Sequence, residues 1–258
     1  MKRFNRDGVK IKNSIKLFTI SMPKSTKHKI RHFIELVISM AGYVPKNATV
    51  MRTVTILLSL LLTLYFSHYH PYNRNISFFY FIISEVLYIG FISVVLSENG
   101  LRHIFHAKWK NENEAYKAFE AILGFLFFHN AMSIGYVASS TPGNLLDFLN
   151  QDMLFIIVTI MFVAGFLVKI SAANVVSIEI YYWKDMFLGR KITDFVVSGP
   201  YKYLNNPMYG IGHLPAYAVA IWYGSVYGLL SAVLNQILIF SFYYFIERKF
   251  IRGIYVTS

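Results

Sequence analysis

The stretch Met208–Ile246 reads MYGIGHLPAYAVAIWYGSVYGLLSAVLNQILIFSFYYFI and consists of two apolar segments that meet at Gly224. The first, Met208–Tyr223, is short for a membrane crossing. The second, Ser225–Ile246, has the roughly 20 apolar residues that a helix needs to cross the hydrocarbon of a bilayer. Because almost nothing joins them, the two segments must form a tight antiparallel hairpin of helices.

Four further apolar stretches precede this hairpin, and each is long enough to span a membrane. The chain has 258 residues, of which 55% are hydrophobic and 15% are charged, whereas soluble domains usually carry about 25% charged residues. The absence of Cys excludes disulfides, thiol catalysis and cysteine zinc sites, and we expect no metal site. We therefore predict an all-α polytopic membrane protein with about six transmembrane helices. The four stretches are Thr49–Ser67, Ser77–Ser97, Ala118–Ala138 and Met153–Val176.

The connections between these stretches alternate between rich and poor in Lys and Arg. Residues 98–117 and 177–207 carry four each and the C-terminal end carries three, whereas 68–76 carries one and 139–152 carries none. Positive residues concentrate on the cytoplasmic side of membrane proteins. The alternation predicts six crossings with both termini in the cytoplasm, within a transmembrane domain at residues 49–258.

The N-terminal residues 1–48 form a predicted basic cytoplasmic arm. Residues 1–52 hold twelve Lys and Arg against two acidic residues, so they carry +10 of the net charge of +12. Basic charge beside a membrane span favours anionic lipid as a partner, and not nucleic acid, which needs a basic face on a folded soluble domain. Residues 27–37 are predicted to form an amphipathic helix in the membrane interface, with a disordered basic tail as the alternative.

Glu85, His129 and Lys169 are ionisable residues inside the predicted spans. Glu85 and His129 lie at similar depth near the centres of the second and third spans, which predicts a structural hydrogen bond between them. Lys169 lies near the cytoplasmic end of the fourth span, where its side chain is expected to snorkel toward the interface.

A polar stretch, SGPYKYLNNPMYGIGH at Ser198–His213, leads into the hairpin. Asn206 followed by Pro207 predicts a helix start, because Asn caps free backbone N–H groups and Pro suits the first helical turn. A helix start at a membrane surface is also an anion site, although a simple cap is the plainer interpretation. Pro215 is expected to bend the fifth helix.

This stretch, the hairpin and Glu247 at its end together resemble the membrane-embedded S-adenosylmethionine-dependent methyltransferases. That superfamily includes isoprenylcysteine carboxyl methyltransferases and phospholipid N-methyltransferases, and the Asn before Pro207 with Met-Tyr after it is more similar to the phospholipid branch. VKISAANVVSIEIYYWKDMF (Val168–Phe187) and IERKFIRGIY (Ile246–Tyr255) are similar to the larger phosphatidylethanolamine N-methyltransferases. Two departures are the single Glu247, where smaller members have paired glutamates, and the absence of a Gly-x-Gly motif near Gly165.

The resemblance implies S-adenosyl-L-methionine as cofactor, with Glu247 pairing with its α-ammonium group. Tyrosine rings can face its sulfonium cation, although an interfacial aromatic belt would also account for them. The expected cofactor-binding residues are Tyr201, Tyr203, Asn205, Asn206, Pro207, Met208, Tyr209, Gly210 and Glu247, and the expected substrate-binding residues are Lys169, Trp183 and His213.

The acceptor amine must be neutral to attack, so a carboxylate is needed to accept its proton. Asp185 is the first candidate because it falls in the stretch that resembles the family, and Glu179 is the second. A surface ion pair is the alternative role for Asp185.

These features together predict N-methylation of phosphatidylethanolamine, and of its mono- and dimethyl derivatives, toward phosphatidylcholine at the cytoplasmic face. The phospholipid substrate would lie in the membrane, and the resemblance implies the endoplasmic reticulum. The alternatives are carboxyl methylation of a prenylated cysteine, a sterol-type reductase, and a non-catalytic family member acting as a scaffold. The oligomeric state stays open.

Overall fold

The computed structural model describes residues 24–69, 71–109, 111–194 and 196–256, and this part of the chain is helical without any strand. Five of its helices are long and apolar enough to cross a membrane. The protein is therefore an integral membrane protein, and the predicted all-α polytopic fold is confirmed. The five are α2 (Val50–Tyr69), α3 (Arg74–Leu96), α5 (Glu112–Ser140), α6 (Gln151–Val176) and α10 (Val226–Phe242) with its C-terminal continuation.

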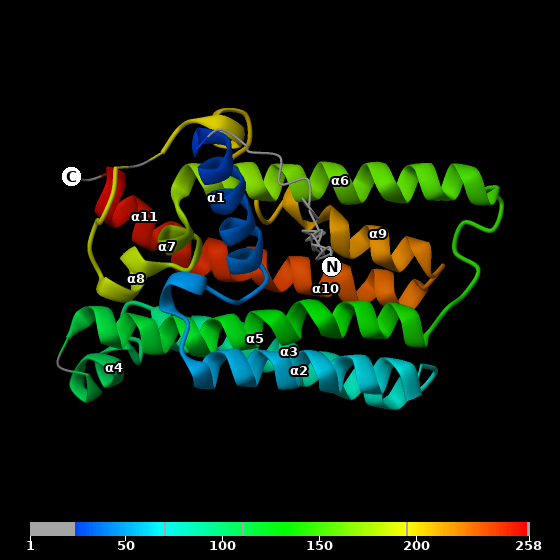
Figure 1. The fold of residues 1–258 in the computed structure, drawn as a ribbon, viewed down its shortest axis with the longest axis horizontal. Helices are drawn as coiled ribbons and strands as arrows, with labels where there is room; N and C mark the ends of the chain where they lie inside the picture. The colour runs from blue at the N-terminus through cyan, green and yellow to red at the C-terminus, as the bar shows by residue number, and fades with distance from the viewer. Residues whose placement is uncertain (1–23, 70, 110, 195, 257–258) are drawn as a thin grey trace, which may run out of the picture.

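The long helices run side by side (Figure 1). The connections rich in Lys and Arg lie at one end of the bundle and the connections poor in these residues lie at the other. The connections rich in Lys and Arg lie at the end that holds α4 (Arg102–Lys108), α7 (Ile178–Tyr181), α8 (Lys184–Leu188) and α11 (Arg248–Ile251). The poor connections lie at the other end. We call these the basic end and the neutral end of the bundle.

The fifth predicted crossing differs from expectation, because only its second half is an α-helix. This helix, α9, spans Leu214–Trp222, and an irregular stretch with two 3₁₀ turns leads into it, η2 (Gly199–Lys202) and η3 (Ile211–His213). Pro215 lies in the first turn of α9, where its missing N–H costs no hydrogen bond. It therefore starts the helix and does not bend it.

The predicted hairpin is present, and Gly224 makes it tight. Gly224 has φ +59°, a left-handed conformation that suits glycine. At this turn the N–H of Gly143 donates to the Tyr223 carbonyl and that of Leu145 donates to the Gly224 carbonyl, both at 3.1 Å. The hairpin tip is thereby fastened to the α5–α6 connection at the neutral end.

Close packing of α9 on α6 explains Gly165. A Cβ atom added at Gly165 would lie 2.4 Å from Cδ of Pro215 and 2.9 Å from the Ile211 carbonyl oxygen. Only glycine leaves room for this approach. The single glycine in α6 is thus explained by helix packing, and no Gly-x-Gly motif is needed to explain it.

The predicted helix in the arm is α1 (Lys24–Met40), which lies steeply across the spanning helices (Figure 1). Leu36 and Met40 pack on Ile170 and Ala173 of α6. Phe33 stays about half exposed, at 48%. This helix therefore has one face on protein and another exposed, and its position in the membrane interface stays a prediction. The remainder of the arm, residues 1–23, lies outside the described residues.

The predicted bond between Glu85 and His129 is wrong. Glu85 accepts from the side-chain amides of Asn130 at 2.8 Å and of Asn235 at 2.7 Å, while His129 Nδ1 pairs with the Tyr80 hydroxyl at 2.7 Å. Neighbouring residues on a helix point about 100° apart. Glu85 therefore meets Asn130 and not the histidine beside it, and the three polar groups join α3, α5 and α10.

Candidate functional site

The last helix carries Glu247 through an irregular turn. The segment Tyr243–Glu247 (η4) is a π-helical turn between α10 and α11, and such turns occur often at functional sites. A π turn inserts a residue into the helix and so shifts the residues after it around the axis. Glu247 stands at the end of this turn, on the basic end of the bundle.

Glu247 is held by two neutral donors. The Tyr209 hydroxyl donates to its Oε2 at 2.9 Å, and the Trp183 indole N–H also donates to this carboxylate. The ion pairs among the described residues all use other carboxylates, and Arg248 instead stacks over Tyr244 at 5.3 Å. Within the described residues, Glu247 thus forms no ion pair with a cationic side chain.

Trp183 reaches Glu247 from an unusual backbone position. Its φ of +53° lies in the left-handed region, at the residue before α8, and such a conformation in a bulky residue marks a site under constraint. The ring is buried and packs edge-on against Phe242, with 5.2 Å between ring centroids. The sequence before α8 is therefore folded back onto the last helix.

Tyr209 is presented by a single capped turn. The Asn206 side chain accepts from the Tyr209 N–H at 3.2 Å, and the Asn206 carbonyl accepts from the Gly210 N–H at 3.0 Å. Asn206 caps a turn as predicted, yet α9 begins only at Leu214. Because the N–H groups of Tyr209 and Gly210 are engaged within the turn, they do not form the predicted anion site.

Asp185 lies close to this cluster but with both oxygens occupied. Its Oδ2 accepts from the Tyr255 hydroxyl at 2.9 Å and its Oδ1 from the Met186 N–H at 2.8 Å. Burial raises the pKa of the Asp185 carboxyl, and the Tyr255 and Met186 hydrogen bonds act in the opposite direction. The carboxyl fastens the end of the chain to α8.

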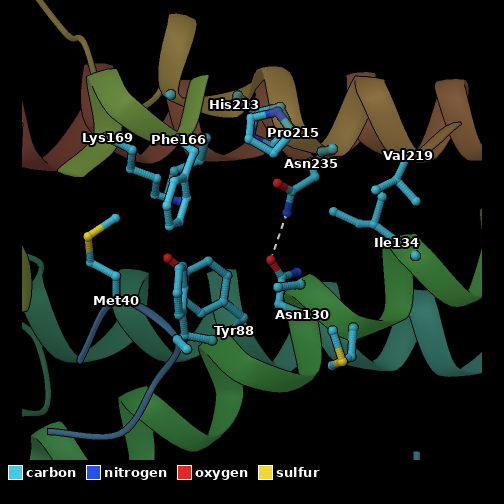
Figure 2. A pocket seen from close by; sticks show the side chains of 18 of the residues that line it. Met40, Tyr88, Asn130, Ile134, Phe166, Lys169, His213, Pro215, Val219 and Asn235 are labelled. Atoms are coloured by element: carbon cyan, nitrogen blue, oxygen red, sulfur yellow. Dashed lines mark hydrogen bonds between the residues drawn. The ribbon is translucent and has the colours of Figure 1, made fainter. Parts of the chain in front are cut away.

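A large cavity lies between α6, α9 and α10 on one side and a wall formed by α2, α3 and α5 on the other. In Figure 2, Lys169 and Asn235 on the first side face Tyr88 and Asn130 on this wall. Its volume is about 610 Å³, within the range of about 300–1,000 Å³ that is usual for small-molecule sites. Trp183 and Tyr209 line it toward the basic end, and Ser139 and Tyr223 line it toward the neutral end. The cavity therefore follows much of the length of the bundle.

All three predicted substrate residues and two predicted cofactor residues line this cavity: Lys169, Trp183, His213, Met208 and Tyr209. Lys169 does not snorkel outward, because its Nζ lies over the Phe127 ring at 5.2 Å from the centroid. His213 donates through Nε2 to the Ala232 carbonyl at 3.1 Å, as expected of a polar group satisfied inside a bundle. The structure thus gathers these side chains along one space.

Other predicted site residues separate into near and distant groups. Tyr201 lies near Glu247, since burial and then the Glu247 charge raise the pKa of its phenol. Tyr203 is 80% exposed and stacks under Lys202, and Asn205 is also exposed. Glu179 faces outward in an ion pair with Lys184 at 3.4 Å. Pro207 is buried beneath the turn, and Gly210 lies against the Asn206 carbonyl.

Two polar residues at the site were not predicted as parts of it. Gln236 donates to the Tyr209 carbonyl at 2.8 Å and accepts from the Tyr217 hydroxyl, so it holds the Tyr209 turn against α10. Tyr255 bonds Asp185. Two adjacent amides, Asn235 and Gln236, within an otherwise apolar span were the signal that could have found the first of these.

The fold and the site together define a polytopic helical membrane protein with an intramembrane cavity and an acidic, aromatic cluster at one end. Residues 153–258 match a family model described as phospholipid methyltransferase. Over this segment, which holds the Tyr209–Glu247 cluster, the chain is similar to the phospholipid methyltransferases.

Proteins named phosphatidylethanolamine N-methyltransferase are similar to this chain. The protein from Eremothecium gossypii is 30% identical over 123 residues, covering 47% of this chain and 15% of the relative. That from Meyerozyma guilliermondii is 30% identical over 135 residues, covering 48% and 15%. That from Candida tropicalis is 29% identical over 102 residues, covering 39% and 12%. The matched part is thus a small share of these longer relatives, and no solved structure matches the chain.

Proposed function

We propose that the protein transfers methyl groups from S-adenosylmethionine to the amine of phosphatidylethanolamine, and then to its methylated derivatives. The observation that carries this proposal is the Tyr209–Glu247 hydrogen bond. It joins the NNPMYG stretch to the glutamate of the last helix within the segment that matches the family. The similar proteins named phosphatidylethanolamine N-methyltransferase support the same acceptor.

The residues around Glu247 fit the cationic parts of S-adenosylmethionine. Among the residues that the structure describes, the carboxylate bonds the two neutral donors named above and no cation, so it can balance an ammonium group. The rings of Tyr201, Tyr209 and Trp183 offer π faces to a cation. When bound, the cofactor supplies a methyl group on a sulfonium centre that leaves as a neutral thioether.

In this proposal the chain acts mainly through positioning and exclusion of water. An in-line displacement gains most from holding the amine and the methyl donor in line. An apolar cavity also lowers the pKa of an amine, because burial disfavours the charged form, and so it favours the neutral nucleophile. Glu247 and Tyr209 would fix the donor end, and the cavity would hold the acceptor.

In this proposal Asp185 is not the general base that the sequence predicts. Both of its oxygens are engaged and it does not line the cavity. It would act as a positioning residue that holds Tyr255 and thereby the last helix. Glu179 is exposed and paired with Lys184, so it would not take part in proton transfer.

The cellular setting forms part of the same proposal. The basic end of the bundle would face the cytoplasm, because connections rich in Lys and Arg stay on that side. The basic helix α1 would then meet anionic lipid at the same surface. The resemblance to the larger eukaryotic enzymes supports the endoplasmic reticulum as the membrane.

A methylation assay in detergent or nanodiscs tests the function. Purified protein is supplied with methyl-labelled S-adenosylmethionine and phosphatidylethanolamine, and the extracted lipids are separated. We expect label in monomethyl and later derivatives, with a loss of at least about 100-fold in Glu247→Gln. Label in a prenylated cysteine peptide but not in lipid would replace the proposed acceptor. The absence of cofactor binding would favour a non-catalytic role.

A further inference from the structure

Lys169 is a cation in the cavity that has no anionic partner among the described residues. Its ammonium lies over the Phe127 ring, and the ion pairs of the described part of the chain all use other cations. A charge in apolar surroundings is costly unless it is paired. An anion from outside the chain would supply the missing partner.

The packing around Lys169 directs its side chain into the cavity. Gly212 lies against the stem of Lys169, since a Cβ atom at Gly212 would be 3.3 Å from the lysine Cβ. In Figure 2, Lys169 and Phe166 extend from α6 toward Tyr88 on the opposite wall. The cation therefore stands inside the cavity and not at its rim.

The rest of the lining tells which kind of anion fits. Between Lys169 and the neutral end the cavity is lined mainly by apolar groups, among them Phe162, Phe166, Ile134 and Val219. A small free anion would gain nothing from such a surface, whereas an acyl chain would be buried along it. One cation beside a long apolar space matches an amphiphile with an anionic head.

We propose that the Lys169 ammonium binds the phosphate diester of a phospholipid whose acyl chain lies in the cavity. The inference rests on the proposed function only for the identity of the amine. In an ethanolamine headgroup two carbons separate the phosphate oxygen from the amine. A phosphate at Lys169 therefore leaves the amine toward Tyr209, which lines the same cavity and bonds Glu247. Lys169 is thus a specificity-determining residue for phosphate-bearing acceptors.

The test is lipid binding by the whole detergent-purified protein in the absence of a methyl donor, measured by native mass spectrometry. The probes are phosphatidylethanolamine and a dialkylglycerol ether of ethanolamine that lacks the phosphate. The variants are Lys169→Met, which keeps the length of the stem, and Lys169→Arg, which keeps the charge. Lys117→Met is the matched control, because Lys117 is an exposed lysine on α5.

We expect Lys169→Met to weaken binding of phosphatidylethanolamine at least about tenfold. Lys169→Arg should stay within about threefold of the wild type because it keeps a phosphate-binding cation, and Lys117→Met should match the wild type. The phosphate-free lipid should bind wild type and Lys169→Met equally.

Three results would overturn the inference. Equal binding of phosphatidylethanolamine by wild type and Lys169→Met would remove the phosphate contact. If Lys169→Met weakens binding of S-adenosylmethionine but not of phosphatidylethanolamine, Lys169 would instead bind the carboxylate of the cofactor. Full displacement of the lipid by millimolar inorganic phosphate would indicate a free-anion site.

The same measurements separate this inference from the proposed function. Binding of phosphatidylethanolamine that depends on Lys169, without methyl transfer to any lipid, would leave the inference standing and remove the function. If the wild type methylates the lipid and Lys169→Met binds phosphatidylethanolamine as well as the wild type does, the proposed function stands and this inference is removed.

Discussion

The Tyr209 hydroxyl and the Glu247 carboxylate lie 2.9 Å apart, although 38 positions separate them in the sequence. Tyr209 precedes the helical hairpin and Glu247 follows it, so the bond closes the hairpin into a loop at the basic end. The bond forms only when α9 and α10 pack correctly. The geometry of the candidate site therefore depends on the packing of the hairpin.

Removing the Tyr209 hydroxyl should weaken cofactor binding. Hydrogen bonds to charged groups contribute about 1.5–3 kcal/mol, so Tyr209→Phe should lower the affinity for S-adenosylmethionine by roughly tenfold or more. Isothermal titration of the purified protein measures this change. Tyr203→Phe is the matched control, because that ring is 80% exposed, and it should bind as the wild type does. Equal losses in the two variants would contradict the role given to Tyr209.

The polar cluster around Glu85 should stabilise the bundle through its hydrogen bonds and not through the negative charge of the carboxylate. Glu85→Gln keeps an oxygen that accepts from Asn130 and Asn235, so thermal unfolding in detergent should stay close to that of the wild type. Glu85→Leu leaves two buried amides without this acceptor and should cost at least about 2 kcal/mol. An unfolding midpoint for Glu85→Leu equal to that of Glu85→Gln would show that the cluster contributes little.

The contact between α6 and α9 should tolerate no side chain at position 165. Gly165→Ala forces a Cβ atom against Pro215, and overpacking of this kind costs about 1–3 kcal/mol. Gly90→Ala on α3 is the control, since a Cβ atom there meets nothing within 4 Å. We expect a lower unfolding midpoint for Gly165→Ala and an unchanged or higher one for Gly90→Ala. The reverse order would mean that α9 does not pack on α6 in this way.

The buried carboxyl of Asp185 should make stability depend on pH. Its pKa is raised in the folded protein, so the folded state holds this proton more tightly than the unfolded state does. The contribution to stability is complete below the unfolded pKa and is lost as the pH rises through the folded pKa. The unfolding midpoint of the wild type minus that of Asp185→Asn should therefore fall as the pH is raised from about 4 to 7. A constant difference over that range would argue against a buried carboxyl at this position.

Sequence reasoning predicted the helical class and the arrangement of the connections because both depend on composition along the chain. Apolar length identified the long helices, and the distribution of Lys and Arg separated the two ends of the bundle. The fifth crossing was predicted to be short, but its irregular first half was not predicted. Nothing in a hydropathy pattern reveals that a crossing begins as two 3₁₀ turns and a capped turn.

Side-chain partners between helices were harder to predict, because they depend on how each helix is rotated about its axis. Asn130 and His129 are neighbours on α5, so their side chains point in different directions around the helix axis. Asn130 contacts Glu85, and His129 contacts Tyr80. The direction of Lys169 likewise depends on the close approach of Gly212, which fills the space beside its stem. Such contacts arise only once the helices are packed.

The cavity wall formed by α2, α3 and α5 precedes residue 153, so it lies outside the segment that matches the family. Under the proposed function, the residues that would hold the methyl donor lie inside that segment, whereas the acceptor chain would also meet this wall outside it. Variation at wall positions such as Thr63, Leu123 and Ile134 can alter the preferred acyl chain while Tyr209 and Glu247 stay unchanged. Under the proposed function, substitutions on this wall can thus change acceptor preference without altering the residues that would hold the methyl donor.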